Sequence, residues 1–347
     1  MSPTPASATV GLVFPLAPPP PAPPLTTVQL AGQRVVFAFG GTGIPRPLRL
    51  RIQRGQAAGV LLFATNVRSA GQVRALTRAL QAIPRPAGLR APLVVMTDQE
   101  GGLVKRIPGA PFRSPPQLAA TGHTAAAYAE GRATGSTLRS VGVNVDLAPV
   151  TDVARAGSEI EREGRSFGRS AATVQRFAAA FARGLQSRDV AATDKHFPGF
   201  GAASANTDNA PVVITSPLAT LRGIDERPYA STPARLAMVS SAIYPALDPG
   251  TPALLSRAVV TGELRGRVGF SGVTVTDSLD AAALAGRGDV ALQAAAAGAD
   301  LLLFTSYRSS SRAVNTLATA LQQGRLDAGE ARASVARSLA LRASLPR

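Results

Sequence analysis

The sequence predicts a single (β/α)8 barrel, an α/β fold of the TIM-barrel type, preceded by a proline-rich N-terminal tail. Two observations carry this prediction. Eight short runs of β-branched and apolar residues recur along the chain, and Ala/Leu/Arg stretches of helical period separate most of them. This alternation continues from about residue 33 to the C-terminus without a break, so residues 29–347 are expected to form one domain.

The first 28 residues are expected to form a tail or tether outside the barrel. Prolines crowd residues 15–24, and such a segment forms a stiff, extended polyproline stretch. The apolar patch before it has no basic residues in front of it, which makes a poor secretory signal. A cytoplasmic location is slightly favoured over the cell envelope, and an export signal upstream of this start would reverse that preference.

The eight candidate strands are short and largely apolar, which is typical of the buried strands of a parallel barrel. They are residues 34–40, 59–64, 93–98, 143–149, 190–196, 236–242, 273–278 and 299–304. Stretches with apolar residues at helical spacing lie between or after them. These candidate helices are residues 70–83, 125–142, 171–188, 256–269, 289–298, 311–324 and 327–344.

A doubly wound open sheet is the alternative architecture. It calls for a glycine-rich phosphate turn after an early strand. The turn FGGTGIP at residues 39–45 follows the first strand, but it lacks the full glycine spacing and opens no clear helix. The barrel is therefore preferred.

Composition limits the chemistry that the chain can perform. The sequence has no cysteine, which rules out disulfides and thiolate catalysis, and it has only two histidines. We expect no metal and no organic cofactor. No apolar run approaches the roughly 20 residues that a membrane-spanning helix needs, so no membrane span is expected.

Arginine supplies nearly all of the positive charge, and the formal net charge is +16. A nucleic-acid partner would favour a basic tract interleaved with aromatic residues that stack on bases. The arginines are instead spread along the chain with few aromatics among them, so we expect most of them on solvated helix faces and no nucleic-acid partner. Attraction to an anionic polymer is an intermediate alternative.

Charged residues gather at the ends of four predicted strands, among flanks that are almost all apolar. They are Asp98 and Glu100 after the third strand, Glu163 and Arg165 in the loop after the fourth, Lys195 and His196 at the fifth, and Asp277 at the seventh. The carboxyl ends of parallel strands meet at one rim of a barrel. Carboxylates accept from paired hydroxyls, and lysine and arginine donate to ring oxygens, so the set fits a sugar.

Four segments resemble, in order and spacing, the bacterial β-N-acetylhexosaminidases of glycoside hydrolase family 3. They are DQEGGLVKR at 98–106, EGRSFG at 163–168, KHFPGFG at 195–201 and VTDSLD at 275–280. The resemblance covers the chain from about residue 33 onward. It implies a single (β/α)8 barrel without an added α/β sandwich, a carbohydrate substrate, and no cofactor.

The resemblance also implies roles for individual residues. Asp277 matches the nucleophile that forms a glycosyl-enzyme intermediate. The residues that match sugar-binding positions are Asp98, Arg106, Arg165, Lys195 and His196.

The loop after the fifth strand departs from the family pattern. Members usually continue KHFPGHG and then D-S-H, and the Asp-His dyad of that loop is the acid/base. Here Phe200 replaces the first histidine, Asn206 stands at the dyad aspartate and Asp208 at the dyad histidine. Asp208 is one candidate acid/base, with a pKa raised by burial. The other candidate carboxylates are Glu100, Glu163 and Asp194.

The expected function is a retaining exo-glycosidase that removes β-linked N-acetylglucosamine from peptidoglycan fragments or related glycans. Two alternatives stay open. One is a family 3 β-glycosidase of another sugar specificity. The other is a sugar-binding barrel with weak or no catalysis, which the altered dyad motivates.

Overall fold

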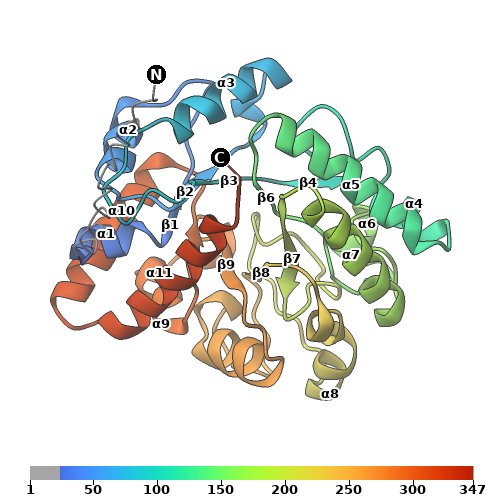
Figure 1. The fold of residues 1–347 in the computed structure, drawn as a ribbon. Coiled ribbons are helices and arrows are strands. Elements are labelled where there is room, and N and C mark those ends of the chain that lie inside the picture. The colour runs from blue at the N-terminus through green and yellow to red at the C-terminus, as the bar shows by residue number, and fades with distance from the viewer. Residues whose placement is uncertain (1–23, 347) are drawn as a thin grey trace, which may run out of the picture.

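The computed structural model describes residues 24–346, which form a closed barrel of eight parallel strands surrounded by helices (Figure 1). The strands are β1 (Val35–Phe37), β2 (Gly59–Leu61), β3 (Val94–Thr97), β6 (Val145–Asp146), β7 (Ala191–Phe197), β8 (Leu236–Val239), β9 (Val273–Ser278) and β10 (Leu301–Leu303). They follow one another round the barrel in chain order, and β10 pairs with β1 to close it. Each lies within a predicted strand or one residue beyond it, and the predicted fold class is confirmed.

The strands are buried on both faces, as their apolar composition predicts. Side chains alternate across a strand, so Val36 of β1 lies in the cluster that fills the barrel, whereas Val35 and Phe37 lie in the larger cluster that includes the surrounding helices. All three are fully buried. The barrel interior is therefore a packed core, and a ligand site is expected only at its ends.

Helices cover the outside of the barrel. The longer ones are α2 (Arg46–Gln53), α3 (Ala70–Gln81), α5 (Thr124–Ser140), α7 (Ala171–Gln186), α9 (Val290–Ala297), α10 (Tyr307–Gln322), α11 (Ala328–Ala343) and a π-helix, η5 (Ala258–Arg267). The short ones are α1 (Thr27–Gly32), α4 (Pro115–Ala120), α6 (Glu159–Arg162) and α8 (Leu218–Thr220). A small hairpin, β4 (Gln99–Gly101) with β5 (Val104–Lys105), follows β3. Within residues 24–346 no helix has the length and apolar character needed to cross a bilayer.

The start of the folded region lies close to the predicted boundary of the tail. Helix α1 begins at Thr27, inside the last residues of the segment predicted as a tail. The proline-rich part of that segment, up to residue 23, lies outside the described residues.

Helix α2 was not expected, and the turn at residues 39–45 does lead into a helix. Its apolar residues Leu48, Leu50 and Ile52 are spaced two apart, with arginines between them. This spacing hides the helical period. Leu48 and Ile52, four residues apart, are fully buried, whereas Leu50 is 38% exposed. Only two positions of the helix face the core, so the pattern carried little signal.

Two arginines are exceptions to the expectation that most residues of this type lie on solvated faces. Arg34 and Arg342 are buried, and both donate hydrogen bonds to backbone carbonyls, Arg34 to Ala295 and Ala299 and Arg342 to Pro92. Burial lowers the pKa of Arg34 to about 10 and that of Arg342 to about 9. These side chains serve the fold and not the solvent surface.

Helix α11 closes the N-terminal end of the barrel. Its Leu341 belongs to the cluster that fills the barrel, and Arg342 bonds the carbonyl of Pro92, just before β3. At the opposite end, where the strands terminate, residues 24–346 leave a cavity.

Candidate active site

The carboxyl ends of the strands surround a cavity of about 200 Å³. Side chains from the ends of β2, β3, β7, β8, β9 and β10 line it, together with loops after β3, β6 and β7. Every predicted site residue except the alternative carboxylate Asp194 lines this cavity: Asp98, Glu100, Arg106, Glu163, Arg165, Lys195, His196, Asp208 and Asp277. The structure thus brings together segments that lie up to 180 residues apart in the chain.

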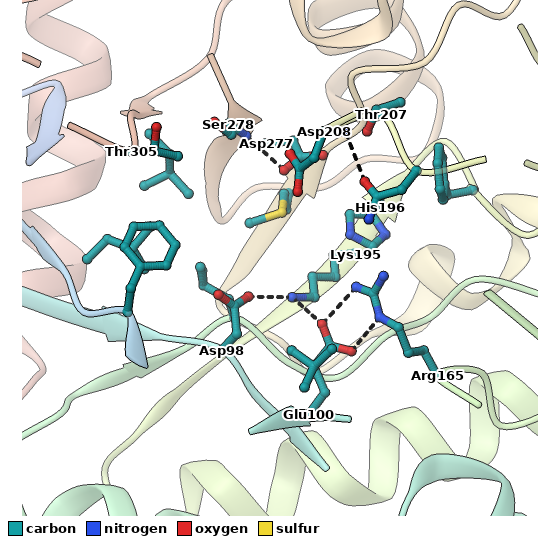
Figure 2. A pocket seen from close by; sticks show the side chains of 18 of the residues that line it. Asp98, Glu100, Arg165, Lys195, His196, Thr207, Asp208, Asp277, Ser278 and Thr305 are labelled. Carbon is teal, nitrogen blue, oxygen red and sulfur yellow. Dashed lines mark hydrogen bonds and ion pairs between the residues drawn. The ribbon is translucent and has the colours of Figure 1, made fainter. Parts of the chain in front are cut away.

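One side of the cavity is a network of paired charges (Figure 2). Lys195 Nζ lies 2.8 Å from Asp98 Oδ1 and 2.7 Å from Glu100 Oε1. Arg165 donates through Nε and Nη2 to the two carboxylate oxygens of Glu100, each at 2.8 Å. Its Nη1 also donates to Glu163 at 3.1 Å. Such bidentate, charge-assisted bonds fix the positions of the side chains.

Burial disfavours the charged forms of Glu100, Arg165 and Lys195, and the pairing of their charges outweighs this effect. Burial raises the pKa of Glu100, but the charges of Arg165 and Lys195 hold that pKa well below its usual range. Burial lowers the pKa of Lys195, and the adjacent Asp98 and Glu100 carboxylates raise it overall. The pKa of Arg165 is raised in the same way by Glu100. Glu100 therefore stays ionised and is unsuited to donating a proton.

The two other alternative carboxylates are also poorly placed. Glu163 lines the cavity but is paired with Arg165. Asp194 does not line the cavity, although it directly precedes Lys195 on β7; it is fully buried, and its burial raises its pKa to about 7. Its position agrees with the alternation of side chains along a strand.

Lys195 and His196 both face the cavity although they are consecutive in β7. The pairing of β7 with β8 shifts in register between Lys195 and Phe197, and an irregularity of this kind redirects a side chain. The peptide bond between Lys195 and His196 is cis, as is the one between Phe197 and Pro198.

Asp152, which the sequence did not nominate, holds His196. Its Oδ2 lies 2.8 Å from His196 Nδ1, and its Oδ1 accepts from the backbone N–H groups of His196 at 3.0 Å and Phe200 at 2.6 Å. The Asp152 side chain is fully buried. A carboxylate at Nδ1 makes that nitrogen the donor and leaves Nε2 for a ligand. The signal was available, because Asp152 ends the segment LAPVTD after the fourth strand.

The other side of the cavity holds two carboxylates. Asp277, near the end of β9, accepts from the N–H of Ser278 at 2.8 Å and from Ser241 Oγ at 3.4 Å. Asp208 lies near it in Figure 2. Burial raises the pKa of Asp208, and the negative charge of Asp277 raises it further. Neither carboxylate forms an ion pair within residues 24–346.

Backbone hydrogen bonds place the loop that carries Asp208. The carbonyl of Thr207 accepts from Ala283 N at 3.1 Å, and the carbonyl of Asp208 accepts from Ala282 N at 3.3 Å. Residues 282 and 283 come shortly after β9, which carries Asp277. The loop is thereby tied to the segment that follows Asp277.

The chain matches the family model described as the glycosyl hydrolase family 3 N terminal domain over residues 42–341. The chain belongs to glycosyl hydrolase family 3. The match includes every segment that lines the cavity, and it confirms the resemblance and the enzyme class, a family 3 glycoside hydrolase. Membership implies a glycoside substrate.

Sequence relatives of this family 3 chain include proteins of similar length. An uncharacterized secreted glycosyl hydrolase of Arthroderma benhamiae is 38% identical over 331 residues, which are 91% of this chain and 93% of the fungal protein. A β-hexosaminidase of Pseudomonas aeruginosa is 34% identical over 284 residues, covering 80% of this chain and 83% of that protein.

Solved structures of the family superpose closely on the barrel. A family 3 β-N-acetylglucosaminidase from Paenibacillus sp. FPU-7 gives a TM-score of 0.87 at 34% identity, with 92% of this chain covering 63% of that chain. This chain thus spans less than two thirds of the Paenibacillus protein. A β-N-acetylhexosaminidase from Beutenbergia cavernae gives a TM-score of 0.84 at 30% identity, covering 92% of this chain and 99% of that one.

Proposed function

We propose that this family 3 hydrolase is a retaining exo-acting β-N-acetylhexosaminidase that releases terminal N-acetylglucosamine from peptidoglycan fragments or related glycans. The observation that carries the proposal is the pair Asp208 and Asp277, two carboxylates without cationic partners among the described residues, opposite a neutralised network in one cavity. Most retaining glycosidases use two carboxylates, one as nucleophile and one as acid/base. The name of the Beutenbergia protein supports an N-acetylhexosamine, and the name of the Paenibacillus protein supports N-acetylglucosamine.

In this mechanism Asp277 attacks the anomeric carbon while Asp208 gives its proton to the departing glycosidic oxygen. The bond between the anomeric carbon and that oxygen breaks, and an ester between the sugar and Asp277 forms. Asp208, now ionised, then takes a proton from water, whose oxygen attacks the anomeric carbon and frees Asp277. The raised pKa of Asp208 suits the first step, because the carboxyl group keeps its proton at higher pH.

The paired side of the cavity has the task of holding the sugar. Asp98 offers carboxylate oxygens to hydroxyls, and Arg165, Lys195 and His196 offer N–H donors. Their mutual bonds fix the donors before the substrate arrives, which lowers the cost of ordering them on binding. A compact ammonium also bridges Asp98 and Glu100 in a way that a forked guanidinium does not reproduce.

The test is a panel of p-nitrophenyl β-glycosides (N-acetylglucosaminide, glucoside, xyloside) with the full chain and an Asp277→Ala variant. We expect the N-acetylglucosaminide to be hydrolysed fastest, and the variant to lose about 10³-fold or more in rate because the nucleophile is gone. Asp289→Ala, which removes a helix-capping carboxylate that does not line the cavity, is the control and should retain activity. Unchanged hydrolysis by Asp277→Ala would disprove the nucleophile, and a faster glucoside would disprove the sugar.

A sugar-binding barrel with little catalysis is the second candidate. The observation that favours it is the acid/base loop, which contains no histidine between Gly199 and Pro211. Calorimetry with N-acetylglucosamine distinguishes the two: binding without turnover of any aryl glycoside supports this candidate, and turnover refutes it.

A further inference from the structure

One sector of the barrel surface is formed by a segment of the chain that contains arginines and no acidic residue. No aspartate or glutamate precedes Asp98, whereas the same 97 residues contain ten arginines. Nine of these lie between residues 46 and 90, on α2, on α3 and on the loops around them. We call this surface the α2–α3 sector. Figure 1 shows α2 and α3 on the same side of the barrel, where the neighbouring strands β1, β2 and β3 place them.

Most arginines of the α2–α3 sector point into solvent. The exposed ones are Arg46, Arg49, Arg54, Arg68, Arg74, Arg78 and Arg90. Arg51 is half-buried and joins the sector to α10, because its Nη2 donates to Ser311 at 2.8 Å and to Asn315 at 3.1 Å. Helix α10 adds two exposed arginines, Arg308 and Arg312, and contains no acidic residue.

Elsewhere on the surface several arginines form ion pairs with carboxylates. Examples are Arg169 with Glu161, Arg222 with Glu263 and Arg257 with Glu330. In the described part of the chain, none of the seven exposed arginines of the α2–α3 sector forms an ion pair. All the acidic residues of the chain follow residue 97, so no acidic residue of the same segment balances the positive charge of the sector.

The arrangement within the helices is unfavourable without a counter-charge. Arg46 and Arg49 are three residues apart on α2, and Arg74 and Arg78 are four apart on α3, so each pair lies on one helix face. Like charges at this spacing cost about 0.2–0.5 kcal/mol per pair. A bound polyanion removes that repulsion.

The chemistry of the sector narrows the kind of polyanion. Guanidinium groups bind phosphate and carboxylate groups through two parallel hydrogen bonds. Phe63 is the only aromatic residue between 46 and 90, so the sector offers almost nothing on which bases could stack. Leu50 is its only exposed large apolar residue, which is too little to insert into a lipid surface.

We propose that the α2–α3 sector binds an anionic glycan, a chain whose repeating units carry phosphate or carboxylate groups. The sector lies on the side of the barrel, whereas the cavity opens at the carboxyl ends of the strands. A polymer held by the sector therefore keeps the enzyme attached and leaves the cavity free for a chain end. The proposal does not depend on which sugar the cavity hydrolyses.

Binding of two soluble polymers to the full chain tests the proposal. The probes are polygalacturonate, whose sugars carry carboxylates, and phosphorylated dextran, whose sugars carry phosphates, and their relative affinities distinguish the two kinds of anionic group. The sector variant combines Arg46→Gln, Arg49→Gln, Arg54→Gln and Arg78→Gln. The control variant combines Arg132→Gln, Arg176→Gln, Arg183→Gln and Arg227→Gln. All four positions are exposed: the first lies on α5, the next two on α7, and the last at the start of a short 3-10 helix. Both variants lose the same net charge, so only the location of the loss differs.

We expect the wild type and the control variant to bind at least one of the polymers, with an affinity that falls steeply with salt. The sector variant should bind at least about tenfold more weakly. The slope of its log affinity against log salt concentration should fall in magnitude by about 3, because binding with fewer arginine contacts releases fewer counterions. Thermal unfolding of both variants reports on folding. Equal weakening in the two variants, no binding by the wild type, or tighter binding of duplex DNA or of anionic phospholipid vesicles would overturn the proposal.

Discussion

The two sides of the cavity differ in how their charged side chains are paired. On one side Lys195 and Arg165 neutralise the carboxylates around them through contacts of 2.7–3.1 Å. On the other side Asp208 and Asp277 form no ion pair in the described part of the chain. Pairing with Arg165 and Lys195 keeps Glu100 ionised, whereas burial and the nearby charge of Asp277 raise the pKa of Asp208 and favour its protonated form. The paired side is thus suited to holding a ligand and the unpaired side to moving protons.

The largest effect should come from the unpaired side. Replacing Asp208 with Asn removes the proton donor, and we expect hydrolysis of β-linked disaccharides to slow by about 10²–10⁴. p-Nitrophenyl glycosides should slow far less, because p-nitrophenolate leaves with little protonation. Steady-state rates on both substrate types measure the difference. Equal losses on the two types would remove Asp208 from the mechanism.

The pH profile of the same variant provides a second check. Since the pKa of Asp208 is raised, the wild type should keep its disaccharide activity above the usual range of an aspartic acid and lose it as Asp208 ionises. The Asp208→Asn variant should lack that alkaline limb. Glu163→Gln, which changes a carboxylate on the paired side of the same cavity, is the matched control and should retain it.

The next largest effect concerns stability and comes from Asp194, a buried carboxylate that does not line the cavity. Asp194 has a pKa of about 7 in the folded protein and about 3.8 when unfolded, so the folded state binds its proton more tightly. The free energy of unfolding should therefore fall by about 3 kcal/mol between pH 5 and pH 8 on account of this group. In Asp194→Asn that contribution should vanish. Urea unfolding at the two pH values measures it, and an identical fall in both proteins would contradict the prediction.

The smallest effect should come from replacing Asp152, which holds His196 in place. Asp152→Asn removes the carboxylate that orients His196, and we expect kcat/KM to fall by about 10–100-fold, the equivalent of one hydrogen bond to a buried group. Imidazole nitrogen NMR measures the proton on Nδ1, and the spectrum is simple because the chain has two histidines. The His123→Gln variant retains only the signal of His196, which assigns that signal. A variant that loses activity while His196 keeps its protonated Nδ1 would show that Asp152 acts in another way.

The barrel could be predicted because burial leaves a direct trace in the sequence. Strands buried on both faces appear as short apolar runs, and the eight runs correspond to β1, β2, β3, β6, β7, β8, β9 and β10. Helix α2 left no such trace, since only Leu48 and Ile52 face the core. The buried Arg34 could not be foreseen either, because its partners are carbonyls more than 260 residues away and carbonyls have no sequence signature.

The cavity could be predicted because charged residues at strand ends are rare among apolar flanks. The pairing inside it could not. Strand ends locate Asp98, Glu100 and Lys195 at one rim, but nothing in their spacing indicates that Lys195 bridges the other two. Asp152 was overlooked for a related reason: its importance lies in a contact with His196, 44 residues further on.

The backbone N–H groups of Ala283 and Ala282 donate to the carbonyls of Thr207 and Asp208. These main-chain bonds fix the distance between the segments that carry the two carboxylates. The side chain at position 208 has no part in those bonds. Exchanging its chemical type, as in Asp208→His or Asp208→Glu, should retune the working pH of the enzyme while the loop keeps its anchorage.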